Sequence, residues 1–337
     1  MIRIYFLFSV FFITTIQAQQ VKIISAEVKS SFRGLSVVDN KTIWVSGSNG
    51  VVGRSVDGGN KWSFQTVSGY EKTDFRDIEA FNDSTAIIMG IDCPARILKT
   101  TNAGATWELM FEDTTKGMFL DAMEFWNEKS GVVLGDPIQG KAFTARLSKT
   151  SSTWEPKSYN KRPPLDSGEA FFASSGTNIR TLNNHDMVAI TGGVHSNLLI
   201  NNQKIKLPIL QGIESTGANS IAVKDSNTFM IVGGDFMKKD SIEGNYCFTK
   251  NKGKTWEFSK QPPSGYRSCV EYLGKSNWIT CGLNGVDYTT DDGLHFSKIS
   301  EEGFHVCRKA KNGKSVYFAG GKGRIGKLVG LTAENKR

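Results

Sequence analysis

The segment Ser55-Val56-Asp57-Gly58-Gly59-Asn60-Lys61-Trp62 decides the fold, because altered copies of it recur about every 45 residues. The later copies end at Trp107, Trp154, Trp256 and Phe296, and the double interval between Trp154 and Trp256 leaves room for one degenerate copy. In most copies an Asp or Asn side chain can accept backbone N–H bonds of a tight turn, and a Gly supplies positive φ. A fixed period of this size indicates a repeat architecture.

The repeated pattern Ser/Thr-x-Asp-x-Gly-x-Thr-Trp resembles the Asp-box, or BNR repeat. This repeat is found in sialidase-like β-propellers and in propellers similar to photosystem II stability and assembly factors. The copy at 55–62 fits apart from Lys61, where Thr is usual, while Asn102 and Asn251 replace the Asp in later copies. The copy around Thr150 has lost both Asp and Gly. The resemblance covers essentially the whole chain after residue 18 and implies a β-propeller.

Two further marks each occur seven times. An inner strand is expected to begin at Phe32, Phe75, Phe119, Tyr266 and Phe304, with weaker equivalents near Ala170 and Ala218. A glycine ends the next apolar run at Gly47, Gly90, Gly135, Gly192, Gly233, Gly282 and Gly320. The runs between these marks are short and rich in Val, Ile, Phe and Trp, which predicts strands, and no long segment has helical spacing. We therefore predict an all-β, seven-bladed β-propeller with four-stranded antiparallel blades.

The seventh unit has segments for only three strands, at 304–310, 315–320 and 324–330. We predict that the N-terminal segment 21–28 supplies the fourth strand and closes the ring, which would also hold both chain ends in place.

Residues 1–18 predict a secretory signal, with Arg3 as the charged start, an apolar core over 4–13 and a cleavage site after Ala18. The apolar stretch is too short to span a bilayer as a helix, so no transmembrane segment is expected. Residues 19–337 are predicted to form a single propeller domain, because a ring grows by repetition. These features predict a secreted or periplasmic protein.

The formal net charge is +8, a modest excess for 337 residues, and no segment resembles a nucleic-acid-binding module. The excess favours solvated lysines at hairpin tips, or a weak attraction to anionic glycans or membrane surfaces. Five cysteines leave at least one unpaired. Cys269 and Cys281 are expected to face each other across a hairpin, and Cys307 is expected at the position that Cys269 holds in the previous unit. Both buried free thiols and a disulfide fit this placement.

In a propeller, the loops before the inner strands and the loops after the second strands share one face. Arg or His is expected at one shared position in four inner strands, where the side chains can line the central channel and bind a carboxylate, sulfate or phosphate. The candidate ligand-binding residues are Arg33, Arg76, Asp121, Asp136, Glu169, Asp235, Arg267 and His305. The alternative is that the Arg and Asp side chains pair and close the channel. No metal-ligand spacing, nucleotide loop or cofactor motif occurs, so no metal or cofactor is predicted.

Two functions fit these residues. The favoured one is an exported, non-catalytic scaffold that binds a protein partner or an anionic glycan, with no catalytic residue assigned. The alternative is a sialidase-like glycoside hydrolase, with Arg33, Arg76 and Arg267 for the substrate carboxylate, Tyr266 and Glu169 as nucleophile and base, and Asp77 or Asp121 as acid. Sialidases usually carry Arg-Ile-Pro near the first inner strand, whereas this chain has Arg33-Gly34-Leu35. The sequence does not specify an oligomeric state.

Overall fold

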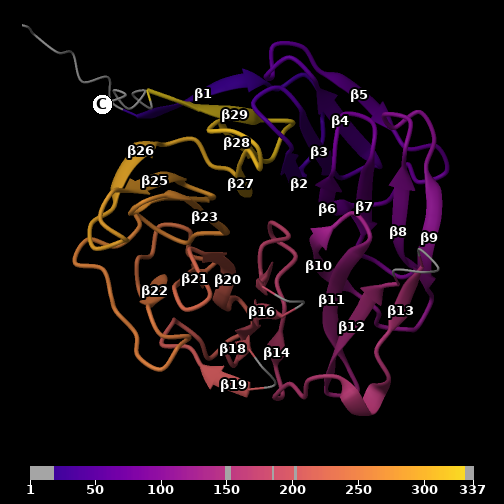
Figure 1. The fold of residues 1–337 in the computed structure, drawn as a ribbon. Coiled ribbons are helices and arrows are strands. Elements are labelled where there is room, and N and C mark those ends of the chain that lie inside the picture. Colours follow the sequence, from indigo (N-terminus) through magenta and orange to yellow (C-terminus); the bar gives the residue numbers. More distant parts are fainter. Residues whose placement is uncertain (1–18, 149–152, 184–185, 201–202, 331–337) are drawn as a thin grey trace, which may run out of the picture.

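The computed structural model of the chain describes residues 19–148, 153–183, 186–200 and 203–330. Seven antiparallel sheets stand around a central axis (Figure 1), which confirms the predicted seven-bladed β-propeller. The predicted signal at 1–18 and part of the degenerate repeat around Thr150 lie outside the described residues. The structure includes a 3₁₀ turn, η1 (Tyr159–Lys161), and the described part of the chain contains no helix long and apolar enough to cross a membrane.

Blades 1 to 3 each contain four strands in chain order, with the first strand nearest the axis (Figure 1). Blade 1 contains β2 (Phe32–Val37), β3 (Ile43–Gly47), β4 (Val51–Ser55) and β5 (Ser63–Thr66). Blade 2 contains β6 (Phe75–Ala80), β7 (Ala86–Gly90), β8 (Ala95–Thr100) and β9 (Glu108–Asp113). Blade 3 contains β10 (Leu120–Asn127), β11 (Ser130–Ile138), β12 (Lys141–Leu147) and β13 (Trp154–Pro156).

Blades 4 to 6 follow the same plan, except that the sheet of blade 5 is extended. Blade 4 contains β15 (Ile179–Thr181), β16 (Met187–Ile190), β18 (Asn197–Ile200) and β19 (Gln203–Lys206). The sheet of blade 5 has the order β14 (Glu169–Ala170), β17 (Gly192–Gly193), β20 (Thr216–Val223), β21 (Phe229–Asp235) and β22 (Tyr246–Thr249). Blade 6 contains β23 (Cys269–Gly274), β24 (Asn277–Gly282), β25 (Gly285–Thr289) and β26 (Ser297–Ser300).

Blade 7 combines strands from both ends of the chain. It contains β27 (Val306–Lys309), β28 (Val316–Ala319), β29 (Ile325–Val329) and β1 (Gln20–Ser25). Strand β1 pairs antiparallel with β29, with Val21 opposite Leu328, and the two lie side by side in indigo and yellow in Figure 1. The outer edge of the last blade is therefore supplied by the first strand of the described chain.

The repeated turns have one geometry and lie on one side of the ring. In the first copy Ser55 Oγ accepts the Gly59 N–H at 2.9 Å and Asp57 Oδ1 accepts the Lys61 N–H at 2.9 Å. The same pair of bonds recurs in the copies that contain Asn102, Asn251 and Asp291. Among the repeat aromatics, Trp154 and Phe296 are buried, whereas Trp62, Trp107 and Trp256 are only half-buried.

We call the face with these turns the lower face. The opposite, upper face carries the loops that precede the inner strands and those that follow the second strands, which meet where the Ser48 N–H donates to the Ser31 carbonyl at 3.2 Å. The apolar core lies between neighbouring blades. One cluster joins Phe32 of blade 1 to Ile279 of blade 6 and Phe318 of blade 7, all fully buried. Packing of each sheet on its neighbours fixes the inner strands around the axis.

Candidate functional site

A segment that follows β14 enters the centre of the ring (Figure 1). We call residues 171–178 the plug. The Arg33 guanidinium of blade 1 donates to the Ser174 carbonyl at 3.2 Å, and the Ser175 hydroxyl donates to the Ser268 carbonyl of blade 6 at 2.8 Å. The Arg308 guanidinium of blade 7 donates to a further plug carbonyl at 3.4 Å. The prediction of an inner strand near Ala170 is therefore wrong, because the fourth inner strand, β15, begins only after the plug.

A pocket of about 450 Å³ opens above the plug on the upper face, and we call it the upper pocket. Its aromatic lining consists of Phe119, Phe171, Phe172, Phe236 and Tyr266. Its polar and charged lining consists of Arg33, Arg76, Asp136, Ser174, Asn219, Ser268 and His305. Apolar walls with a few converging polar groups are typical of ligand-binding sites.

Two arginines give the upper pocket a positive side. Burial and the neighbouring charge of Arg76 lower the pKa of Arg33. Arg76 pairs with Asp74 at 2.8 Å, and its guanidinium carbon lies 6.0 Å from the centre of the Phe119 ring. No ion pair joins Arg33 to a carboxylate among the described residues, so its charge is available to an anion.

His305 and Asp136 line the upper pocket beside the two arginines. Burial, followed by the charge of Arg33, lowers the pKa of His305 to about 3, so its imidazole is neutral at physiological pH. Its Nε2 lies 3.3 Å from the Ser31 hydroxyl. Burial raises the pKa of Asp136 to about 6, although its carboxylate accepts the Phe171 N–H at 2.9 Å. The structure thus brings four of the predicted residues, Arg33, Arg76, Asp136 and His305, to one pocket.

Arg267 does not join them, because the predicted alignment of blade 6 is wrong by one residue. The backbone N–H of Arg267 donates to the Gly233 carbonyl of the preceding blade at 3.0 Å. The N–H groups of Phe32 and Phe304 make the equivalent bond to a glycine carbonyl of the blade before theirs, Gly320 and Gly282 respectively. Arg267 therefore occupies the position of these buried phenylalanines, and Ser268 occupies the pocket-facing position. A shift of one residue turns a side chain to the other face of a strand.

The side chain of Arg267 is fully buried inside blade 6. Its Nε donates to Asp287 Oδ2 at 2.6 Å, and its other nitrogens donate to Asn284 at 2.6 Å and to the Tyr266 carbonyl at 2.8 Å. The predicted alternative, in which arginine and aspartate neutralise each other, holds for this residue, although the pair lies within the blade and not in the channel.

The remaining predicted acids also lie away from the pocket lining. Asp121 is fully buried with no hydrogen bond to either carboxylate oxygen from the described residues, and burial and the charge of Asp136 raise its pKa well above the usual range. Glu169 accepts bonds from Asn197 at 2.8 Å and Lys204 at 2.7 Å. Asp235 accepts the N–H of the residue two positions later, at 3.0 Å, in the turn after β21. Glu169 and Asp235 thus make structural contacts of their own, whereas Asp121 is buried without one among the described residues.

The described residues do not assemble the sialidase-type set. Arg267 is committed to Asp287, which leaves Arg33 and Arg76 in the pocket without a third predicted arginine. The Tyr266 hydroxyl donates to Asn219 Oδ1 at 2.7 Å, whereas the carboxylate of Glu169 is bound elsewhere. The predicted nucleophile and base therefore make separate contacts.

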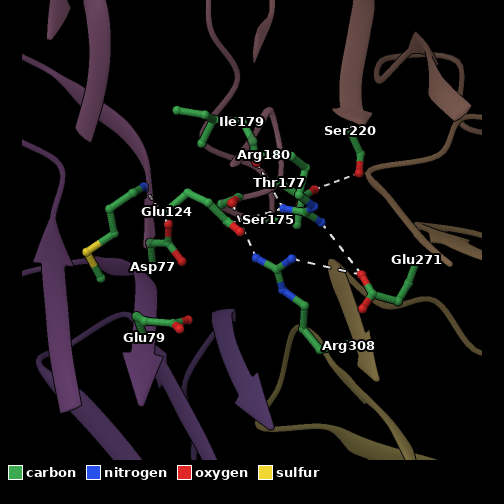
Figure 2. Close-up of polar contacts among 12 residues, drawn as sticks. Asp77, Glu79, Glu124, Ser175, Thr177, Ile179, Arg180, Ser220, Glu271 and Arg308 are labelled. Atoms are coloured by element: carbon green, nitrogen blue, oxygen red, sulfur yellow. Dashed lines mark hydrogen bonds and ion pairs between the residues drawn. The ribbon is translucent and has the colours of Figure 1, made fainter. Parts of the chain in front are cut away.

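A second cavity, of about 390 Å³, lies at the lower ends of the inner strands. Figure 2 shows Arg180 and Arg308 between Glu124 on one side and Glu271 on the other. Arg180 lies 3.5 Å from Glu124 and 3.6 Å from Glu271, and Arg308 lies 4.0 Å from Glu271. Although burial opposes ionisation, the charges of Glu271 and Glu124 raise the pKa of Arg308. The network is internally neutralised, which argues against it as an open ion-binding site.

The sequence analysis missed this network, although a signal for it exists. Glu79, Glu124, Glu271 and Arg308 occupy equivalent register positions on four inner strands, opposite Ile87, Val132, Ile279 and Tyr317. Near them Asp77 is buried and accepts the Ile78 N–H at 2.9 Å and the Met123 N–H at 2.8 Å. Burial raises the pKa of Asp77 to about 7.

Known proteins share this fold. Residues 13–116 match the family described as photosynthesis system II assembly factor YCF48, and no curated protein matches the chain. A structure of YCF48 bound to a D1 peptide is 13% identical, with 92% of this chain and 94% of that chain covered and a TM-score of 0.66. YCF48 from Cyanidioschyzon merolae is also 13% identical, with 92% and 98% covered and a TM-score of 0.66.

The WD40 domain of Pan2 from Neurospora crassa is 12% identical, with 95% of this chain and 98% of that chain covered and a TM-score of 0.64. At these identities the structural likeness concerns the fold alone. Together with the match to residues 13–116, it confirms the resemblance inferred from the repeats: the chain is a seven-bladed β-propeller similar to the photosystem II assembly factor YCF48 family.

Proposed function

We propose that this chain is a non-catalytic scaffold that holds a segment of a protein partner in the upper pocket. The observation that carries the proposal is the position of Arg33 beside an aromatic lining, with one carbonyl contact at 3.2 Å and no carboxylate partner among the described residues. A similar propeller binds a D1 peptide, which supports a peptide as the class of ligand.

The chemistry of the pocket supports a segment that combines an apolar side chain with a carboxylate. Phe171, Phe172 and Phe236 offer an apolar surface for a large apolar or aromatic side chain. Arg33 and Arg76 lie at the same pocket and offer forked donors to a carboxylate, from an acidic residue or a free C-terminus. An arriving anion would also offset the burial and the repulsion by Arg76 that lower the pKa of Arg33.

A peptide display library that includes free C-termini tests the proposal. Enriched peptides should contain an apolar residue near a carboxylate, and Arg33→Ala should weaken their affinity at least tenfold, since a hydrogen bond between charged groups contributes about 1.5–3 kcal/mol. The control is Arg96→Ala, whose ion pair with Glu112 lies on outer strands of blade 2. If the enriched peptides bound Arg33→Ala as tightly as the natural chain but no longer bound Arg96→Ala, the upper pocket would be excluded as the binding site.

The same assay addresses the partner class. An array of sialylated and uronic-acid glycans, measured with the same two variants, should give no binding that depends on Arg33. Binding of a glycan that depends on Arg33, without enrichment of any peptide, would replace the protein partner by an anionic glycan.

We further propose that the protein acts outside the cytoplasm, which the signal predicted at residues 1–18 supports. Mass measurement of the protein after expression in a bacterium should place its first residue at Gln19. A cytoplasmic product that retains Met1 would contradict the proposed export.

A further inference from the structure

Three cysteines from two blades meet in the interior. Cys269 on β23 is the register partner of Cys281 on β24, and Cys307 comes from β27 of blade 7. Their three sulfur atoms lie within 4.8 Å of one another, and all three residues are fully buried. We call these residues the cysteine cluster.

The position of Cys307 differs from the prediction. Cys269 pairs with Cys281, which directly precedes the glycine at the end of the second strand of blade 6. In blade 7 the residue paired with the equivalent position, Ala319, is Val306. Cys307 is therefore one register position beyond the equivalent of Cys269. This offset lets its sulfur join the two sulfurs of the neighbouring blade, and none of the three is in a disulfide.

The cysteine cluster also has polar neighbours. The Thr177 hydroxyl of the plug lies 3.7 Å from the sulfur of Cys269. The same sulfur lies 3.4 Å from the Cys307 carbonyl.

The donor set selects the kind of ion. Three thiolates around one metal at a metal–sulfur distance of about 2.3 Å lie about 4 Å apart, so a small contraction of the cluster would complete a trigonal site. Structural zinc needs four ligands, and no fourth Cys, His, Asp or Glu joins the group in the described chain. Soft thiolates without oxygen or nitrogen ligands favour Cu(I).

We propose that Cys269, Cys281 and Cys307 form a three-coordinate site for Cu(I). Binding replaces up to three thiol protons, which are released to solvent, by the ion, with no change in the oxidation state of sulfur or copper. The bound ion would join blades 6 and 7 near the closure of the ring, and it would stabilise the folded chain because the unfolded chain does not hold the three sulfurs together.

The test is an anaerobic titration of the reduced protein with Cu(I), in competition with a chromophoric chelator such as bicinchoninate. Because the site is buried, each mixture is incubated until its absorbance is constant. One equivalent should be retained, X-ray absorption should report about three sulfur neighbours near 2.3 Å, and the thermal midpoint should rise. Cys307→Ser should weaken retention at least tenfold. The matched control, Cys93→Ser with Cys247→Ser, removes the cysteines outside the cluster and should leave retention unchanged.

Retention below one-tenth of an equivalent, or a copper site with oxygen or nitrogen neighbours, would overturn the proposal. So would a protein that, before any copper is added, has lost two mass units to a disulfide within the cluster. If Cys307→Ser does not fold, the X-ray absorption and thermal measurements on the natural chain with the doubly substituted control still decide the matter.

Discussion

The environment of Arg267 shows how one backbone position determines the role of a charged side chain. Its guanidinium is fully buried and bound by Asp287, Asn284 and a backbone carbonyl. A buried pair of this kind adds little net stability over apolar residues, but removal of one partner leaves an uncompensated charge. Arg267 is therefore expected to be indispensable for folding and not for ligand binding.

Arg267→Met should lower the free energy of unfolding by about 3–5 kcal/mol, because Asp287 would remain buried without its partner. Urea unfolding followed by tryptophan fluorescence measures the change. Arg96→Met is the matched control, since Arg96 and Glu112 are partly exposed at 28% and 37%, and an exposed pair contributes at most about 1 kcal/mol. Equal effects of the two substitutions would show that the Arg267 pair is not the buried contact described above.

Asp77 predicts a pH dependence of stability. Burial raises its pKa to about 7 in the folded chain, against about 4 when unfolded. Between these values the folded chain binds more protons, so a rise in pH lowers the free energy of unfolding, by at most about 1.4 kcal/mol per unit. Above pH 7 the contribution should be constant.

Unfolding of the natural chain and of Asp77→Asn, measured from pH 4 to 9, isolates this contribution. The natural chain should lose stability relative to the variant up to about pH 7, after which the difference should level off. Asp57→Asn is the matched control: N–H groups of its turn, first that of Lys61, lower the pKa of Asp57, so this residue titrates below the measured range and its difference should not change with pH. If the difference in free energy of unfolding between the natural chain and Asp77→Asn did not change with pH, the raised pKa of Asp77 would be contradicted.

At the scale of elements, the plug separates the upper pocket from the charged network below it. Gly176 lies at φ +63°, and a Cβ at this position would come within 2.4 Å of the Asp77 carboxyl carbon. The positive φ favours glycine, and the contact with Asp77 leaves no room for a side chain. The plug therefore depends on both the conformation and the small size of this residue.

Gly176→Ala should destabilise the protein by more than Gly69→Ala. Gly69 also has a positive φ, of +83°, but a Cβ added to it would have no other atom within 4 Å. The control should cost about 1 kcal/mol of backbone strain, whereas Gly176→Ala should cost about 1–3 kcal/mol more from overpacking. Hydrogen exchange of the plug amides would locate the change, and equal costs would show that the plug tolerates the added methyl group.

The repeats predicted the blades well, because each turn is built from local contacts such as those of Ser55 and Asp57. The plug could not be predicted, since Phe171 and Phe172 look like the start of an inner strand and only the neighbouring blades hold them at the axis. Arg267 was misplaced for a similar reason: the position that faces the pocket is set by the alignment of β23 with β24, which the sequence does not mark.

At the scale of the whole molecule, one strand pairing closes the ring. Strand β1 covers the outer edge of β29. The Ile24 side chain packs so closely on Gly59 of the first blade that a Cβ added to this glycine would lie 2.5 Å from it. Closure thus joins the last blade to the first through both backbone pairing and side-chain packing.

Removal of residues 19–25 should lower the thermal midpoint by several degrees, because β29 would lose its partner and blades 7 and 1 would lose packing area. Differential scanning calorimetry measures the effect. Gln20→Ala, an exposed change in the same strand, should leave the midpoint nearly unchanged. A truncated chain that melts like the natural one would show that β1 does not hold the ring together.

This pairing has a consequence for synthesis. The ribosome makes β1 before any other described strand and β29 after all of them, so β1 must wait without its neighbour while six blades emerge. An unpaired strand is a template for association with other chains. Translation that stalls before residue 325 would leave that template uncovered, and the nascent chain should then need a chaperone until the final hairpin arrives.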